Sequence, residues 1–228
     1  MAPEQRNSPV VVFGAGGRAG LAIVAEALRR GRPVLGVVRD PARHSELAAR
    51  GEGVTVVAGD LTAPDSVAAV VPDEVSALVN AVTPFTAPPE SFENFDPDYY
   101  VRLVENLAKA ARGSRVIEIG LAATLRTGSG RVFEDDSAFP AFLRPFAEAR
   151  LKGLAAWREQ AAAVDWLVIT PPPGLSLEAP ATGEYRIAGD VLDSRAAAIP
   201  LSYADLATAV LDQIDQTTMS RQQVTVYG

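Results

Sequence analysis

The chain of 228 residues contains no cysteine and only one histidine, His44. The absence of thiols excludes disulfides, thiolate nucleophiles and zinc–thiolate sites. One histidine is too few for a histidine metal cluster. It lies in a polar segment, which predicts a solvated side chain and gives little support to a Ser-His-Asp triad. We therefore expect no metal site.

Long apolar runs and basic runs are also missing. No apolar run approaches the roughly 18 residues of a membrane span, and no Lys- or Arg-rich run points to nucleic acid. The net charge is −7, and hydrophobic residues make up 48% of the chain, which suits a sizeable core. We expect one soluble, cytoplasmic domain over residues 1–228 with a flexible N-terminus at 1–8. We expect a monomer or homodimer that acts on a small molecule and binds neither nucleic acid nor membranes.

Strand-like and helix-like segments alternate along the chain, which predicts an α/β fold with a doubly wound parallel sheet and helices on both faces. Val- and Ile-rich runs that scarcely alternate are typical of strands buried on both faces. The expected strands are 9–13, 34–38, 54–58, 77–81, 115–119 and 166–170, with a last edge strand at 223–227. The expected helices are 18–30, 62–70, 97–112, 142–163 and 202–214, and capping boxes at 62–65 and 202–205 open two of them.

A glycine-rich turn follows the first expected strand, and its best register is Gly14, Gly17 and Gly20. In a dinucleotide site the first glycine permits a tight turn, the middle ones admit the pyrophosphate, and the last brings helix and strand close. The phosphates would meet free N–H groups and the positive end of the helix dipole. The alternative is a purely structural turn. The residues predicted to bind cofactor here are Gly14, Gly16, Gly17, Arg18, Ala19 and Gly20.

The residues at the end of the second expected strand indicate which dinucleotide binds. An Asp or Glu here accepts from the ribose hydroxyls of NAD, whereas an Arg accommodates the 2′-phosphate of NADP. Arg39 comes first, and Arg18 in the glycine turn can reach the same phosphate, so together they would form a charge-assisted clamp. The pattern favours NADP(H). Asp40 keeps NAD(H) as the alternative.

Three further strand ends supply candidate contacts. Asp60 could accept from the adenine amino group with Leu61 against the ring, although Asp60 could equally lead the next helix. The segment Asn80, Ala81 and Thr83 ends the fourth strand, where the nicotinamide ribose and phosphates should pass. The loop that follows carries Phe85, a candidate substrate contact whose alternative role is to anchor the loop.

These segments together resemble the short-chain dehydrogenase/reductase superfamily in its atypical branch. The resemblance rests on residues 14–20, 37–43, 59–61 and the Pro-Pro-Pro-Gly at 171–174. The C-terminal third is similar to the NAD(P)H-flavin reductase group, which is akin to biliverdin-IX-beta reductase and the NmrA-like proteins, through residues 165–166, 179–186, 190 and 199–206. The resemblance implies a Rossmann-type fold with a small C-terminal substrate cap at about 174–200. It implies that Tyr185 contacts substrate and that Pro172 contacts cofactor.

The departures from this superfamily concern catalysis. Counted back from the Pro-Pro-Gly segment, its catalytic lysine corresponds to Lys152, but its tyrosine corresponds to Glu148. Relatives carry a serine after the fifth strand, where Thr124 is the nearest hydroxyl. Alcohol–ketone chemistry needs an acid matched to an alkoxide, and that acid is missing. Glu148 and Lys152, one turn apart, could handle protons or bind substrate, or form a surface ion pair.

We therefore expect an NAD(P)H-dependent oxidoreductase whose acceptor is a planar conjugated molecule such as a flavin, quinone or enone. Such an acceptor takes hydride directly, so that the protein supplies mainly orientation and a dry pocket. One alternative is a non-redox isomerase, dehydratase or cyclase on the same fold. The other is a dinucleotide-sensing regulator like the NmrA-like proteins.

Overall fold

The structure is a computed structural model that describes residues 8–85, 87, 89–137, 139–159 and 161–228. The strands of its main sheet are β1 (Val10–Phe13), β2 (Val34–Val38), β3 (Val54–Ala58), β4 (Ala77–Asn80), β5 (Arg115–Ile119), β8 (Trp166–Thr170), β10 (Arg186–Ala188) and β12 (Gln222–Tyr227). The α-helices are α2 (Arg18–Arg29), α3 (Ser45–Ala48), α4 (Pro64–Val70), α5 (Tyr99–Ala111), α6 (Arg144–Glu159) and α7 (Tyr203–Asp215).

Shorter elements occupy the loops. The short strands are β6 (Arg126–Thr127), β7 (Gly130–Arg131), β9 (Leu175–Ser176) and β11 (Leu201–Ser202). The 3₁₀ turns are η1 (Pro41–Arg43), η2 (Ala122–Thr124), η3 (Val132–Glu134), η4 (Ala141–Leu143) and η5 (Ala196–Ala198).

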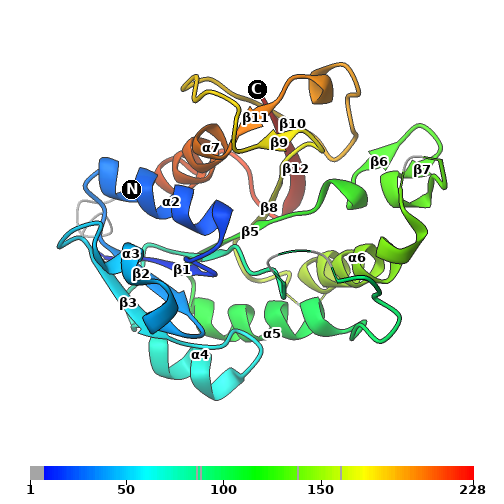
Figure 1. The fold of residues 1–228 in the computed structure, drawn as a ribbon. Coiled ribbons are helices and arrows are strands. Elements are labelled where there is room, and N and C mark those ends of the chain that lie inside the picture. Colours follow the sequence, from blue (N-terminus) through cyan, green and yellow to red (C-terminus); the bar gives the residue numbers. More distant parts are fainter. Residues whose placement is uncertain (1–7, 86, 88, 138, 160) are drawn as a thin grey trace.

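The main sheet has eight strands in the order β10-β12-β8-β5-β4-β1-β2-β3 (Figure 1). The seven neighbouring strands β12, β8, β5, β4, β1, β2 and β3 all run parallel. The remaining strand, β10, pairs antiparallel with β12 at the edge of the sheet. The strand order reverses between β1 and β4, which is the switch point where ligands bind in open α/β sheets. The predicted Rossmann-type doubly wound fold is confirmed.

Helices cover both faces of the sheet (Figure 1). Because successive strand residues point to opposite faces, β1 contributes side chains to the hydrophobic cores on both faces of the sheet. Val10 and Val12 pack with residues of α2 and α7 on one face. Val11 and Phe13 pack with residues of α4, α5 and α6 on the other. The two helix layers therefore leave the carboxyl ends of the strands as one continuous edge.

Local details depart from the sequence predictions. The last strand of the chain, β12, is not the edge of the sheet, because β10 pairs with its outer side. The capping box at 62–65 is not formed: α4 begins at Pro64 without a side-chain cap, because Asp60 instead accepts from Thr62. The box at 202–205 is present, with Ser202 accepting from the Asp205 N–H at 2.9 Å. The predicted helix 142–163 is shorter, since η4 precedes α6 and α6 ends at Glu159.

The segment 174–200 contains β9, β10 and η5 and is tied to α7. The Asp205 carboxylate accepts from the N–H groups of Thr182 and Gly183 at 2.8–3.1 Å. Its predicted role as a substrate cap stays a prediction, as do the single domain and the oligomeric state. The predicted flexible N-terminus lies almost wholly in residues 1–7, outside the described residues. Among the described residues, no helix is long and apolar enough to cross a lipid bilayer.

Candidate functional site

The glycine turn lies where the ends of β1 and β4 approach each other. Gly14 has a positive φ of 76°, and its N–H donates to the Val37 carbonyl at 3.0 Å. A Cβ on Gly14 would lie 2.8 Å from the carbonyl carbon and oxygen of Ala81. Both the conformation and the close approach therefore require glycine at this position.

Helix α2 begins directly on this turn. Its N-cap is Gly17, which has extended backbone and no side chain to cap the first turn. A Cβ on Gly20 would overlap the Gly14 carbonyl oxygen and lie 2.8 Å from the Ala15 Cα. The N–H groups at the start of a helix lack intrahelical partners, so those of Arg18 and Ala19 remain available at the positive end of the helix dipole. This arrangement suits an anion such as a pyrophosphate.

At the end of β2, the Arg39 guanidinium is exposed and the neighbouring Asp40 carboxylate accepts a backbone hydrogen bond. Asp40 accepts from the Ala42 N–H at 3.1 Å and so caps η1. Arg39 and Arg18 are exposed, and neither makes an ion pair or hydrogen bond within the part of the chain that the structure describes. The Ser176 hydroxyl lowers the pKa of Glu178, and Arg18 adds to this effect.

The Asp60 carboxylate at the end of β3 accepts hydrogen bonds within its own turn and does not cap α4. Its Oδ1 accepts from the Thr62 N–H at 2.8 Å and from the Thr62 hydroxyl at 2.7 Å. Leu61 is buried in the core, so its side chain does not face an adenine site. No sequence pattern pointed to Tyr99. Burial and then the Asp60 carboxylate raise the pKa of Tyr99, and Arg39 opposes them, which places this phenol near both groups.

The residues at the end of β4 that were predicted to bind cofactor have different surroundings in the structure. Asn80 is buried, and its amide donates to Glu118 at 3.2 Å and accepts from the Val82 N–H at 3.0 Å. Its side chain therefore braces β4 against β5 and does not point to the cofactor edge. The Ala81 backbone meets the glycine turn, and Thr83 is exposed.

Pro172 follows β8 and is buried. Its carbonyl accepts from the Leu175 N–H at 3.2 Å and so closes the turn into β9. Neighbouring Gly120, at the end of β5, has no room for a Cβ beside the Thr170 hydroxyl. The ends of β5 and β8 are thus in close contact.

The predicted catalytic side chains are not assembled as one group. Thr124 is buried; its hydroxyl donates to the Leu121 carbonyl at 2.8 Å and accepts from Gln223 at 2.9 Å. Glu148 and Lys152 are both exposed on α6. The Lys152 ammonium pairs with Asp98 at 3.0 Å, because α6 packs across the start of α5. No ion pair between Glu148 and Lys152 is seen in the described residues.

Phe85 belongs to an aromatic cluster that anchors its loop. Its ring lies 5.2 Å from that of Phe92 and 5.0 Å from that of Phe146 on α6. Edge-to-face pairs of this kind stabilise packing. The anchoring role is therefore observed, while a substrate contact by Phe85 stays a prediction.

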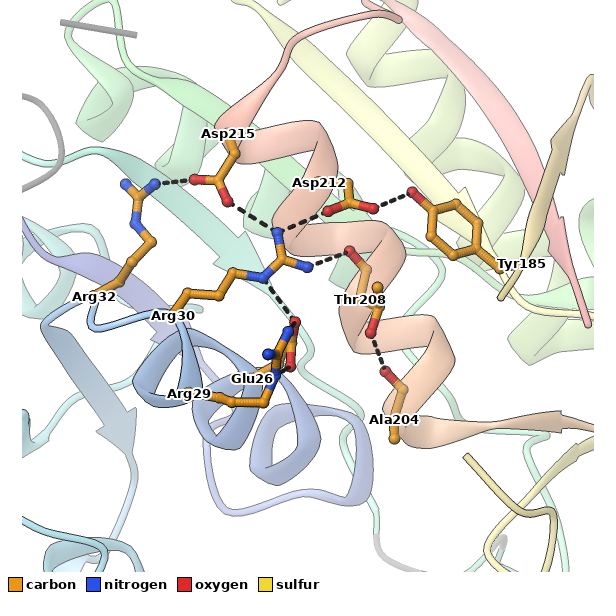
Figure 2. Close-up of polar contacts among 9 residues, drawn as sticks. All are labelled: Glu26, Arg29, Arg30, Arg32, Tyr185, Ala204, Thr208, Asp212 and Asp215. Atoms are coloured by element: carbon orange, nitrogen blue, oxygen red, sulfur yellow. Dashed lines mark hydrogen bonds and ion pairs between the residues drawn. The ribbon is translucent and has the colours of Figure 1, made fainter. Parts of the chain in front are cut away.

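Tyr185 is not brought near the glycine turn. Its hydroxyl donates to Asp212 at 2.6 Å, near the C-terminal end of α7, where Asp212 also meets Arg30 (Figure 2). Arg30 follows the last turn of α2, roughly 18 Å along the helix from Arg18 at 1.5 Å per residue. The resemblance thus assigned Tyr185 to a substrate site, but the fold uses its hydroxyl to attach β10 to α7.

The cavity beside Tyr185 has a volume of about 500 Å³ and lies at this distant end of α2 and α7. Its lining is Arg30, Tyr185, Ile187, Asp212, Gln213, Asp215, Gln216 and Thr218. The carboxylates in it are already paired with arginines. In the described ranges no three His, Asp or Glu side chains are grouped to hold a metal ion.

His44 is the other residue that sequence reasoning missed. It was expected to be a solvated side chain, yet its exposed fraction is 31% and its ring lies against Gly16. A Cβ on Gly16 would lie 2.7 Å from the His44 Nε2. No local pattern could have found this contact, because it joins the loop after β2 to the turn after β1.

Comparisons with known proteins agree with this geometry. The model of the NAD(P)H-binding family matches residues 14–217. YwnB of Bacillus subtilis, an uncharacterized protein, is 27% identical over 221 residues, 94% of this chain and 96% of YwnB.

Two solved structures share the fold. A candidate NADH-flavin reductase from Streptococcus pneumoniae has a TM-score of 0.76 at 21% identity, with 97% of this chain and 99% of that one covered. A candidate epimerase from Bacteroides thetaiotaomicron has a TM-score of 0.80 at 22% identity, with 97% of each chain covered.

Proposed function

The chain belongs to the NAD(P)H-binding family, and we propose that it is an NADPH-dependent reductase of a small planar conjugated acceptor such as a flavin, quinone or enone. One observation carries the proposal. The glycine turn at the switch point is complete, whereas the position of the usual catalytic tyrosine holds Glu148, an exposed carboxylate. The chain thus keeps the features that bind a dinucleotide and lacks the phenol that protonates an alkoxide.

The residues around the turn fit a dinucleotide. Gly14 and Gly20 leave no room for side chains, and α2 begins without a side-chain cap. A pyrophosphate would accept from the N–H groups of Gly16 and of the start of α2, since the Gly17 N–H already donates to the Gly14 carbonyl at 3.0 Å. When bound, the nicotinamide supplies a hydride.

The preference for NADPH rests on charge. Asp40, the residue that would accept from the ribose hydroxyls of NADH, is occupied in capping η1. Arg39 and Arg18 are exposed cations without ion pairs in the described part of the chain. A 2′-phosphate would provide the missing counter-charge through charge-assisted hydrogen bonds. NADH remains the weaker alternative.

The acceptor class follows from what the side chains near the carboxyl edge can do. The Thr124 hydroxyl already makes two hydrogen bonds, and Lys152 is paired with Asp98. A conjugated acceptor takes hydride without a matched acid, and water can complete the proton transfer. The protein then has to orient the acceptor and exclude bulk water.

Apolar side chains are available for such a pocket. The large hydrophobic residues that remain exposed in the described chain are Phe142, Leu177, Val191 and Ile199. They lie in the segments that follow β5, which pairs with β4, and β8, which pairs with β5. Exposed apolar side chains of this kind suit a planar ligand. The name of the Streptococcus pneumoniae structure, an NADH-flavin reductase, supports flavin as the first acceptor to test.

The test is a fluorescence titration with NADPH and NADH, followed by cofactor oxidation with FMN, a quinone panel, an enone and a simple ketone. We expect tighter binding of NADPH, oxidation with at least one conjugated acceptor and none with the ketone. Binding without oxidation by any acceptor would refute the reductase. It would move support to a non-redox enzyme, as the name of the Bacteroides structure suggests, or to a regulator. Binding of neither cofactor would refute the whole proposal.

A further inference from the structure

The single histidine of the chain lies against the phosphate-binding turn. His44 follows η1, six residues beyond the end of β2. Its Cε1, Nδ1 and Nε2 are the atoms nearest to where a Cβ on Gly16 would be, the Nε2 at 2.7 Å and the other two closer. These atoms form the nitrogen-bearing edge of the ring. The imidazole therefore directs its polar edge, not its Cβ side, toward the backbone of the turn.

One ring nitrogen has a partner and the other does not. The Nδ1 lies 3.3 Å from the Glu46 carboxylate. The pKa of Glu46 is lowered by its own backbone N–H and by the His44 ring, so Glu46 stays ionised beside the imidazole. The Nε2 makes no hydrogen bond to any described residue. It remains free to donate to a second anion when the ring is protonated.

The charged groups around His44 leave this corner cationic although the chain as a whole carries −7. Near His44 in the sequence are Arg39, Asp40, Arg43, Glu46 and Arg50, and Arg18 comes two residues after the Gly16 that the ring meets. Asp40 caps η1 and Glu46 meets the ring, while the four arginines make no ion pair among the residues that the structure describes. The Asp40 and Glu46 carboxylates do not balance the charge of these four arginines, so the corner can accept an anionic ligand.

We propose that His44 is a specificity-determining residue whose imidazolium binds the 2′-phosphate of NADPH and takes up a proton as the cofactor binds. The inference rests on the proposed function, because it concerns the same dinucleotide site. The ring bridges the end of β2, where a 2′-phosphate is read, and the glycine turn, where the pyrophosphate lies. Imidazole changes charge between about pH 5 and 8. A phosphate dianion beside Nε2 favours the protonated ring, and the N⁺–H donates to a phosphate oxygen.

The proposal predicts a pH-dependent loss of selectivity in the His44→Gln variant. A charge-assisted hydrogen bond contributes enough that its removal should weaken NADPH binding about 10- to 100-fold at pH 6. The loss should shrink at pH 8, because an ordinary imidazole carries little charge at that pH. Binding of NADH, which has the pyrophosphate but no 2′-phosphate, should change less than about twofold. His44→Arg should retain tight NADPH binding at pH 8.

Calorimetric titration of the full chain tests this directly. NADPH and NADH are titrated at pH 6 and 8 in two buffers of different ionisation enthalpy, which reports the protons taken up. Lys109→Gln, which removes an exposed cation in the last turn of α5, is the control, and circular dichroism verifies folding. We expect more net proton uptake with NADPH in the wild type than in His44→Gln, where only the 2′-phosphate itself can exchange protons.

Two outcomes would overturn the assignment of His44 alone. One is an unchanged affinity for NADPH in His44→Gln. The other is an equal loss for both nucleotides, which would mean that the ring contacts the pyrophosphate. If the wild-type chain binds neither nucleotide, the proposed function fails and this inference fails with it.

Discussion

Replacing Arg30 by alanine should remove the cation that holds α2, α7 and β10 together. Its guanidinium donates to Glu26 at 2.7 Å, to Asp212 at 2.7 Å and to Asp215 at 2.9 Å (Figure 2). Asp212 in turn accepts from the Tyr185 hydroxyl. Although burial lowers the pKa of Arg30, the Asp215, Glu26 and Asp212 carboxylates raise it above its ordinary value. Arg30 is therefore charged at every pH at which the protein folds.

The magnitude follows from burial. The exposed fractions of the Arg30 and Glu26 side chains are 16% and 10%, so removing Arg30 leaves a nearly buried carboxylate with one partner fewer. Breaking a buried pair costs about 3–5 kcal/mol. Asp212 is 43% exposed and is partly compensated by water, which favours the lower value. For a chain of this size, about 3 kcal/mol lowers the Tm by roughly 6–12 °C.

The assay is thermal and urea unfolding followed by circular dichroism, with Arg29→Ala as the matched control. Arg29 pairs with the same Glu26 at 2.6 Å, but its side chain is 69% exposed. Exposed pairs contribute at most about 1 kcal/mol. A loss of stability in Arg30→Ala no larger than in Arg29→Ala would refute the argument that burial makes this cluster important.

The same cluster predicts a pH dependence. Arg29, and to a lesser extent Arg30, lowers the pKa of Glu26 below its ordinary value of 4.5, although burial opposes them. A carboxyl whose pKa is lower in the folded state stabilises the fold above its unfolded pKa, and the stabilisation is lost as the pH falls through the folded pKa. The wild type should therefore lose stability below about pH 4.5 more steeply than Arg30→Ala.

Three further predictions concern the cofactor edge. Gly20→Val should abolish binding of both nucleotides while circular dichroism shows a folded chain, because its Cβ would overlap the Gly14 carbonyl; nucleotide binding with wild-type affinity would contradict this. Thr124→Val should lower stability by about 1–2 kcal/mol and leave kcat with the best acceptor within threefold, since both hydrogen bonds of its hydroxyl are internal; a tenfold fall in kcat would instead make it catalytic. Arg39→Ala should weaken the binding of NADPH about tenfold or more and the binding of NADH little. Asp40→Ala should change the affinities for both nucleotides about equally, because Asp40 caps η1. Titrations of both variants with both nucleotides check these expectations.

Much of the fold could be predicted from hydrophobic pattern alone. Strands buried on both faces need apolar side chains at successive positions, and so β2, β5 and β8 are found at the predicted residues. Strand β3 is also found there, but it forms a sheet edge and is only partly buried. The glycine turn was equally predictable, because positive φ at Gly14 and close packing at Gly20 are satisfied by glycine and by little else.

Other features depend on contacts between distant residues. The strand at the C-terminus reads as an edge strand, but whether β10 pairs outside it is decided by how segment 174–200 folds back. Thr62 fits the first residue of a capping box, yet its N–H and hydroxyl donate to Asp60 and α4 begins without a side-chain cap. Lys152 is one helical turn from Glu148, yet the packing of α6 on α5 gives it Asp98 as its partner.

The sequence by itself determined the order of strands and helices, the position of the turn that can hold a pyrophosphate, and the absence of a tyrosine where the superfamily has one. These follow from residue types and short-range geometry. Only the tertiary structure decided that Tyr185 lies at the far end of α2, that Asn80 and Thr124 use their polar atoms internally, and that His44 meets Gly16. The physical reason is that each of these contacts joins segments from different strand–helix units, and their spacing is set by packing across the sheet.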